Sequence, residues 1–89
     1  MEHLDIVVTG KVQRVWFRQS TLDKAIELGV NGYTMNLPSG DVYIEAEAES
    51  SVLDKFVNWC KVGPELSKVE DVILTKSELK GFKSFQIVK

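Results

Sequence analysis

The segment VYIEAEAESSVLDKFVNWC, residues 42–60, decides the fold, because two hydrophobic periods follow each other in it. Over 42–49 apolar and acidic residues alternate with the period of two that is typical of a strand. The pattern predicts Val42, Ile44, Ala46 and Ala48 facing inward and Tyr43, Glu45, Glu47 and Glu49 facing solvent. A helix follows, with one apolar stripe made of Val52, Leu53, Phe56, Val57 and Cys60. Ser51 and Asp54 have the spacing of a capping box at its start.

Towards the N-terminus, the chain supplies a hairpin partner, a helix and a first strand. We expect a strand over 31–37, joined to the strand over 42–49 by a tight turn at 38–41. The expected helix over 17–28 has an apolar face at helical spacing and ends at Gly29, and this face comprises Leu22, Ala25, Ile26 and Gly29. The first strand is expected over 4–12, with Leu4, Ile6 and Val8 facing inward.

Towards the C-terminus, Gly63 and Pro64 end the second helix. A fourth strand is expected over 67–75, and the apolar residues Phe82, Phe85 and Ile87 indicate a short edge strand at the end. The element order β-α-β-β-α-β predicts an α+β, ferredoxin-like sandwich: an antiparallel four-stranded sheet, plus the short C-terminal edge strand, with two helices on one face. We expect a single domain over residues 1–89.

The composition excludes several classes of protein. Of 89 residues, 44% are hydrophobic and 27% charged, and 11 Lys and Arg stand against 13 Asp and Glu. The net charge of −2 argues against duplex-DNA binding, which normally needs a basic excess. One cysteine, Cys60, and one histidine, His3, allow neither an internal disulfide nor the usual Cys/His zinc site. With no apolar run of ~20 residues and no signal-peptide pattern, we expect a cytoplasmic protein.

The stretch between the first strand and the first helix carries the chemistry. A sharp turn into a helix leaves backbone N–H groups without partners, and the helix dipole adds positive potential there. Arg18, in the first helical turn, offers a guanidinium that can hold two oxygens of a phosphate or carboxylate. Asn36, at the end of the strand over 31–37, offers an amide. An arginine in a first turn or an asparagine before a turn is by itself a weak signal.

Together the two pieces match a family. GKVQRVWFR, residues 10–18, resembles the acylphosphatase signature G-x-V-Q-G-V-x-F-R, and GYTMNLPSGDV, residues 32–42, resembles the second signature G-W-V-x-N-x-x-x-G-x-V. Gly29, Gly63-Pro64 and residues 81–85 follow the family's order, so the resemblance covers essentially the whole chain.

The resemblance implies the hydrolysis of acyl phosphates by metal-free, in-line attack of water, without cofactor or covalent intermediate. It implies a phosphate-binding loop formed by Gln13, Arg14, Val15, Trp16, Phe17 and Arg18. Arg18 would act on the phosphate and Asn36 would position the water. The expected partners are a small acyl phosphate and inorganic phosphate or another anion at the loop. We expect no nucleic acid, no membrane and a monomer.

Three departures from the family pattern bear on the site. Arg14 replaces the loop glycine, which in a phosphate loop usually permits a positive φ or a close approach of the backbone. A non-glycine residue forced to a positive φ costs on the order of 1 kcal/mol. The Arg14 side chain would crowd the anion, swing outward or add a positive charge. Tyr33 and Thr34 replace Trp and Val, and the Thr34 hydroxyl shares a strand face with Asn36. Trp16 often corresponds to a small residue, and its indole would cover the acyl group or stand as a lone surface aromatic.

Two alternatives remain open at this point. The chain would be a catalytically weakened anion-binding or interaction module if Arg14 spoils the loop. It would be an RNA-binding domain of the same architecture if its sheet carried stacked aromatics, although Tyr43 lies among acidic residues. We interpret Glu45, Glu47 and Glu49 as a solvated sheet face and Cys60 as a core thiol. His3 lies too close to the terminus to be interpreted.

Overall fold

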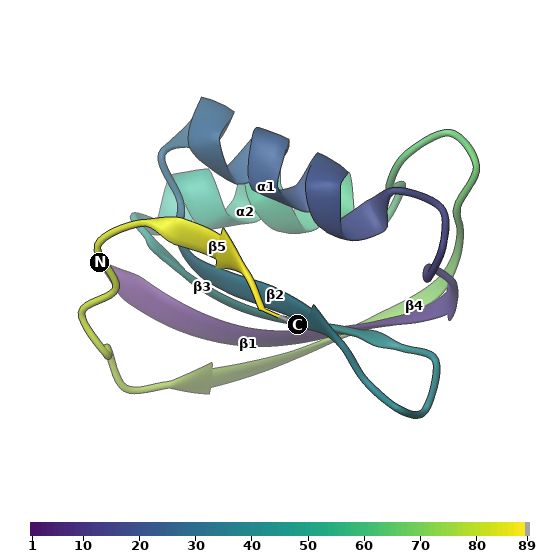
Figure 1. Cartoon of the computed structure of the whole chain (residues 1–89). Helices are drawn as coiled ribbons and strands as arrows, with labels where there is room; N and C mark the ends of the chain where they lie inside the picture. Colours follow the sequence, from purple (N-terminus) through teal and green to yellow (C-terminus); the bar gives the residue numbers. More distant parts are fainter. Residues whose placement is uncertain (89) are drawn as a thin grey trace.

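Seven elements follow one another in the computed structural model, which describes residues 1–88 (Figure 1). They are β1 (Glu2–Lys11), α1 (Phe17–Leu28), β2 (Asn31–Asn36), β3 (Val42–Ala48), α2 (Ser50–Cys60), β4 (Lys68–Ser77) and β5 (Phe85–Ile87). The predicted ranges of the first helix and the first four strands lie within two residues of these bounds. Lys89, the last residue of the predicted domain, lies outside the described residues.

The sheet has five strands in the order β4-β1-β3-β2-β5 and is mixed. The first four are antiparallel to their neighbours, whereas β5 pairs in parallel with β2. The prediction of a four-stranded antiparallel sheet with an added edge strand is therefore corrected to one mixed five-stranded sheet. The parallel pairing arises because the chain leaves β4 at one edge and crosses to the opposite edge before β5 begins (Figure 1). The α+β, ferredoxin-like class is consistent with this arrangement.

Both helices lie on one face of the sheet, as predicted (Figure 1). Phe17, the first residue of α1, is buried and packs against Trp59 of α2, with 5.6 Å between ring centroids. Cys60 is a buried core thiol, as expected, and burial raises its pKa to about 12. The inward-facing residues of the central strands and of α2 make up most of the core: Ile6, Val8, Val42, Ile44, Ala46, Ala48, Leu53, Phe56, Val57 and Cys60.

The buried face of α1 differs from the prediction. Of the residues expected on it, Ala25 is buried and Leu22 is partly buried against the core, whereas Ile26 and Gly29 are exposed. Phe17, Thr21 and Ala25 are the buried residues of the helix, whereas Ile26 is 67% exposed. The buried residues follow each other in steps of four from Phe17 to Ala25. Ile26 is the residue after Ala25, so its side chain is rotated about 100° around the helix axis from that face. The prediction for the helix end is confirmed: Gly29 adopts a left-handed conformation with φ 79°, and its N–H donates to Ala25 O.

The predicted capping box at the start of α2 is wrong. The helix begins at Ser50, with Glu49 as its N-cap, and no side chain caps it. Glu49 O accepts hydrogen bonds from the N–H groups of Val52 and Leu53, so the first turn is already formed at Ser51. Ser51 therefore lies inside the helix, where it cannot serve as the N-cap.

On the outer face of β3, Glu45 and Glu47 are not solvated, contrary to the prediction, whereas Glu49, just after the strand, is exposed as predicted. Glu45 and Glu47 are only 3% and 2% exposed. The segment after β4 folds over them: the backbone N–H groups of Lys80, Gly81 and Phe82 donate to the Glu47 carboxylate. The alternating sequence pattern correctly identified the residues that share this face. The segment that covers them lies more than 30 residues further along the chain.

Within residues 1–88, no helix is both long and apolar enough to cross a membrane.

Candidate active site

The loop between β1 and α1 has an unusual backbone. Arg14 and Trp16 are the non-glycine residues with positive φ among residues 1–88, at 61° and 65°. Residues in the left-handed region that alternate with ordinary ones turn successive backbone N–H groups towards one side, and such nests bind anions. The positive φ expected for Arg14 is confirmed, and that of Trp16 was not foreseen.

The N–H groups of this loop are free to bind a ligand. From Arg14 to Gln19, none of them donates a hydrogen bond within the described residues 1–88. Ser20 N is the first to do so, and it donates to Trp16 O. No acidic residue stands in the first turn of α1, so the positive end of the helix dipole is not neutralised locally. Loop and helix together form a site suited to an anion.

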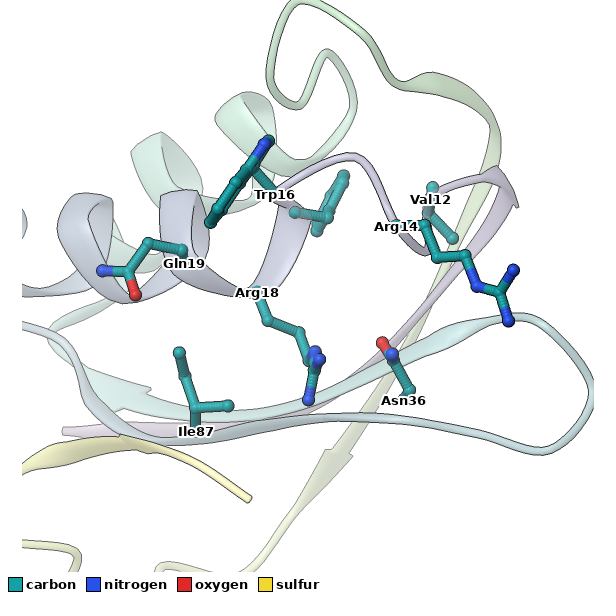
Figure 2. Close-up of a pocket in the computed structure, with 8 residues that line it drawn as sticks. Val12, Arg14, Trp16, Arg18, Gln19, Asn36 and Ile87 are labelled. Atoms are coloured by element: carbon teal, nitrogen blue, oxygen red, sulfur yellow. The ribbon is translucent and has the colours of Figure 1, made fainter. Parts of the chain in front are cut away.

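A pocket of about 420 Å³ opens in front of this loop (Figure 2). Its size suits a small-molecule ligand. It combines the loop and the start of α1 with the end of β2 and a residue of β5. The residues that line it are Val12, Arg14, Trp16, Phe17, Arg18, Gln19, Asn36 and Ile87.

Arg18 and Asn36 extend into this pocket from α1 and β2 (Figure 2). Arg18 is half-buried, and neither its guanidinium nor that of Arg14 forms an ion pair within residues 1–88. The side-chain oxygen Oδ1 of Asn36 is buried and has no hydrogen-bond partner there. Thr34 Oγ1, on the same strand face, is likewise buried and unpartnered. The two oxygens therefore do not bond each other, and Asn36 keeps its acceptor for a ligand.

Of the predicted loop residues, four line the pocket and two do not. Arg14, Trp16, Phe17 and Arg18 belong to the first group, and in Figure 2 the Arg14 side chain runs outward on the opposite side of Asn36 from Arg18. Val15 is buried in the core.

Gln13 holds the loop against the β2–β3 hairpin. Its Nε2 donates to Leu37 O and Asp41 O, both at 2.9 Å. The Gln13 side chain is thus used to bind the hairpin that follows Asn36. Only the backbone of Gln13 remains for binding a ligand.

Ile87 and Gln19 line the pocket although sequence reasoning had not placed them there. Gln19 lies one residue after the family signature, and its place in the first helical turn was the available signal. Ile87 had been expected only as part of an edge strand. Its contribution depends on the parallel pairing of β5 with β2, which no local pattern predicted.

Comparison with known proteins agrees with this geometry. The acylphosphatase family model matches residues 4–87. The chain belongs to the acylphosphatase family. An acylphosphatase of Archaeoglobus fulgidus is 46% identical over 84 residues, covering 94% of each chain.

Solved acylphosphatases share the fold over nearly the whole chain. The crystal structure of the Bacillus subtilis acylphosphatase superposes with a TM-score of 0.97, at 37% identity and with full coverage of both chains. The structure of an acylphosphatase from Coxiella burnetii superposes with a TM-score of 0.94 at 31% identity, covering 98% of this chain and 92% of that chain. The activity that goes with the family is the hydrolysis of acyl phosphates, so the chain is a hydrolase.

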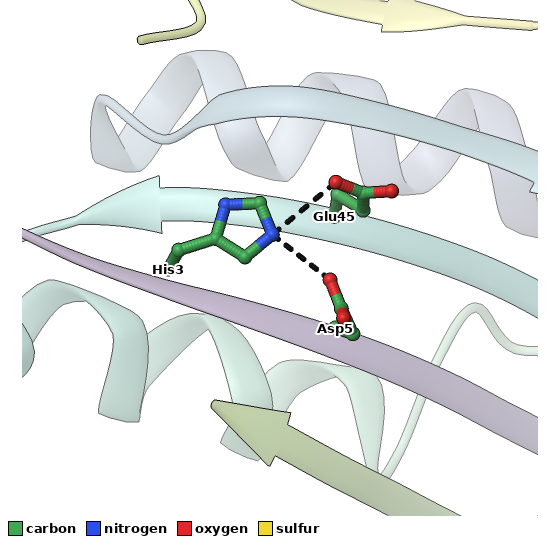
Figure 3. A group of neighbouring side chains, drawn as sticks. All are labelled: His3, Asp5 and Glu45. Carbon is green, nitrogen blue, oxygen red and sulfur yellow. Dashed lines mark hydrogen bonds and ion pairs between the residues drawn. The ribbon is translucent and has the colours of Figure 1, made fainter. Parts of the chain in front are cut away.

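A second charged cluster of this acylphosphatase domain lies away from the pocket, on the outer sheet face (Figure 3). His3, which could not be interpreted from the sequence, is buried there: its Nδ1 lies 2.7 Å from Glu47 Oε2, and its Nε2 lies 2.8 Å from Asp5 Oδ1 and 3.2 Å from Glu45 Oε1. Only the doubly protonated ring donates from both nitrogens. Lys80 Nζ adds a second cation, 2.7 Å from Glu45. Three carboxylates thus face two cations, and backbone N–H groups of residues 80–82 supply further donors to Glu47.

These contacts shift the pKa values of the cluster in opposite directions. Burial opposes the protonated form of His3, but hydrogen bonds to Glu47 and Asp5 and the nearby negative charges outweigh it and raise the His3 pKa. Burial likewise opposes ionisation of Glu45 and Glu47. Hydrogen bonds from the side chains of Lys80, Tyr33 and Tyr43 outweigh it and lower the Glu45 pKa. The Glu47 pKa is lowered by hydrogen bonds from His3 and from the backbone of Lys80 and Phe82. Both kinds of shift favour the ionised forms of His3, Glu45 and Glu47.

Replacing His3 by glutamine is expected to lower the free energy of unfolding by about 3 kcal/mol near pH 6, since removing one partner of a buried ion pair costs about 3–5 kcal/mol. The folded-state pKa lies above the ordinary 6.5, so the stabilisation is complete below that value and is lost as pH rises through the folded-state pKa. The loss should therefore shrink near pH 9, as measured by urea unfolding.

The exposed Lys24–Glu27 pair supplies the control for this experiment. Lys24→Gln should change stability by less than about 1 kcal/mol at either pH. An equal loss for His3→Gln near pH 6 and pH 9 would contradict a charged His3.

Proposed function

We propose that the chain hydrolyses acyl phosphates by metal-free, in-line attack of a water molecule. Backbone N–H groups of residues 13–18 hold the phosphate, the Arg18 guanidinium binds its oxygens, and Asn36 positions the water. The water attacks phosphorus, and the bond from phosphorus to the acyl oxygen breaks with its electron pair leaving on the carboxylate. The proton of the water passes to the phosphate product or to solvent.

The observation that carries this proposal is the unpartnered Oδ1 of Asn36 in the wall of the pocket that Arg18 enters. A buried acceptor without a partner costs about 1–3 kcal/mol, so such groups are normally satisfied by water or a ligand. An amide oxygen accepts a hydrogen bond from a water molecule and so orients the lone pairs of that water. Asn36 is therefore suited to aim a water at a phosphate held by the loop.

Hydrolysis of an acyl phosphate mainly requires stabilisation of the charge on the phosphate and alignment of the attacking water. A carboxylate is a good leaving group, so strong general-acid catalysis is not needed. Negative charge on the phosphate oxygens is matched by one guanidinium and by the free N–H groups of the loop. This supports a mechanism in which the protein's own groups supply the positive charge.

Hydrolysis of benzoyl phosphate in the presence of a chelator tests the metal-free mechanism, with inorganic phosphate as the probe of the loop. We expect full turnover with chelator present and competitive inhibition by phosphate. Loss of turnover on chelation, restored by adding a divalent metal, would overturn the metal-free step. The expected cytoplasmic location and monomeric state remain predictions. The free thiol of Cys60 accords with a reducing compartment.

Replacing Arg14 by glycine is expected to leave kcat within about threefold of the natural chain, because the Arg14 side chain runs away from Arg18 (Figure 2). Its charge should still attract the anion weakly, so the inhibition constant for phosphate should rise by at most about fivefold, and only at low ionic strength. Steady-state kinetics at two salt concentrations measure both effects. A tenfold gain in kcat would instead show that Arg14 weakens the catalytic loop.

A further inference from the structure

Trp16 is the most exposed large apolar side chain in the pocket wall. The residue is 75% exposed, and as the N-cap of α1 it lies where the loop meets the helix. Among the described aromatic pairs, Trp59 packs on Phe17, and Trp16 packs on no ring. The fold therefore gains little from burying this indole.

The backbone at Trp16 is held in an unfavourable region as well. A φ of 65° costs a non-glycine residue on the order of 1 kcal/mol, a cost that a glycine would avoid. Position 16 thus combines backbone strain with an aromatic group that faces water. Neither is explained by packing of the domain, and both lie beside the proposed phosphate site.

The accessible apolar surface of the pocket lies at one end of it. Val12 and Phe17 are named among its lining residues, but each is only 1% exposed. Trp16 and the half-buried Ile87 are left as the apolar groups that a ligand could touch. In Figure 2 both lie on one side of Arg18, with Asn36 on the other.

The placement of Trp16 and Ile87 opposite Asn36 matches the geometry of an in-line displacement. The attacking and leaving oxygens lie on opposite sides of phosphorus. If the water is held at Asn36 and the phosphate at Arg18, the acyl oxygen departs towards the side where Trp16 and Ile87 lie. The acyl group of the bound substrate then occupies the apolar end of the pocket.

We propose that Trp16 is a specificity-determining residue that contacts the acyl group and favours acyl phosphates with an aromatic or extended apolar acyl part. The inference rests on the proposed function, because it takes the phosphate to be held by the loop and Arg18. An indole face stacks on an aromatic acyl group and covers an aliphatic one, whereas a methyl group gains little from it.

The test compares kcat/KM for benzoyl phosphate and acetyl phosphate in the natural chain, Trp16→Gly, Trp16→Ala and Trp16→Phe. We expect the benzoyl-to-acetyl ratio to fall about fivefold in Trp16→Gly and Trp16→Ala. Trp16→Phe should keep the ratio within about twofold. Trp16→Gly accepts the positive φ without strain, so it preserves the loop even if Trp16→Ala disturbs it.

Ile26→Ala is the matched control, since Ile26 is an exposed apolar residue of α1 outside the pocket. The benzoyl-to-acetyl ratio of kcat/KM for Ile26→Ala should equal that of the natural chain. An unchanged ratio in Trp16→Gly, or an equal loss on both substrates, would overturn the acyl contact.

The inhibition constant of inorganic phosphate separates the two proposals. It should change less than the benzoyl-to-acetyl ratio in Trp16→Gly, because glycine keeps the backbone N–H of position 16 and accepts its positive φ. If phosphate does not inhibit the natural chain, the proposed phosphate site fails. If phosphate inhibits as expected and the ratio does not change, only the role of Trp16 fails.

Discussion

Replacing Arg18 by alanine is expected to lower kcat for benzoyl phosphate by about 10³-fold or more, the range found when an arginine that stabilises a transferring phosphoryl group is removed. Arg18 enters the pocket from the first turn of α1 and forms no ion pair within residues 1–88, so its charge is free for the substrate. Inhibition by inorganic phosphate should be lost in parallel. Arg18→Lys should recover only a small part of the activity, because an ammonium cannot bind two oxygens in the planar geometry of a guanidinium.

Lys24→Ala is the control for this prediction. Lys24 is a cation of the same helix, and it pairs with Glu27 on the surface instead of lining the pocket. Its loss changes the net charge by the same amount but should leave kcat and phosphate inhibition within about twofold. Thermal unfolding of Arg18→Ala should match that of the natural chain closely. A folded Arg18→Ala that still turns over at a tenth of the natural rate would remove Arg18 from the mechanism.

Local patterns predicted the fold well where neighbours in sequence are also neighbours in space. The helix over 17–28 and its end at Gly29 follow from apolar spacing and from a glycine that adopts φ 79°. The direction of β5 and the cover over Glu45 and Glu47 could not be predicted in this way. Both depend on where the segment after β4 crosses the sheet, and its backbone N–H groups meet Glu47 across 33 to 35 positions of sequence. An alternating acidic row looks the same whether it faces water or a distant segment.

The residues of the candidate site differ in the same way in how far the sequence could predict them. The signatures placed Arg18 and Asn36, and the structure brings both to one pocket. The glycine replaced by Arg14 pointed to a positive φ there, but nothing marked Trp16, whose side chain type does not favour that region. Ile87 entered the pocket only through parallel pairing with β2. The residues proposed to act on phosphate and water were therefore predictable, and Trp16 was already a candidate to cover the acyl group, whereas the contribution of Ile87 was not predictable.

Asn36→Ala is expected to lower kcat by about 10²–10³-fold, comparable to the loss of one preorganised polar group in an active site. Inhibition by inorganic phosphate should stay within about threefold, because the phosphate is held by the loop and Arg18. This split between turnover and phosphate binding distinguishes a group that orients water from one that binds substrate. Steady-state kinetics of benzoyl phosphate hydrolysis with phosphate as inhibitor measure both quantities.

Thr34→Val provides a close control, because Thr34 Oγ1 is also buried and unpartnered on the same face of β2. Its loss removes a buried polar atom that no group satisfies, so the free energy of unfolding should stay the same or rise by about 1 kcal/mol. Turnover should remain within about twofold, because Thr34 does not line the pocket. If Thr34→Val and Asn36→Ala slowed turnover equally, the effect would belong to the strand and not to the amide. A loss confined to Asn36→Ala assigns the positioning of water to the one unpartnered oxygen that lies at the pocket wall.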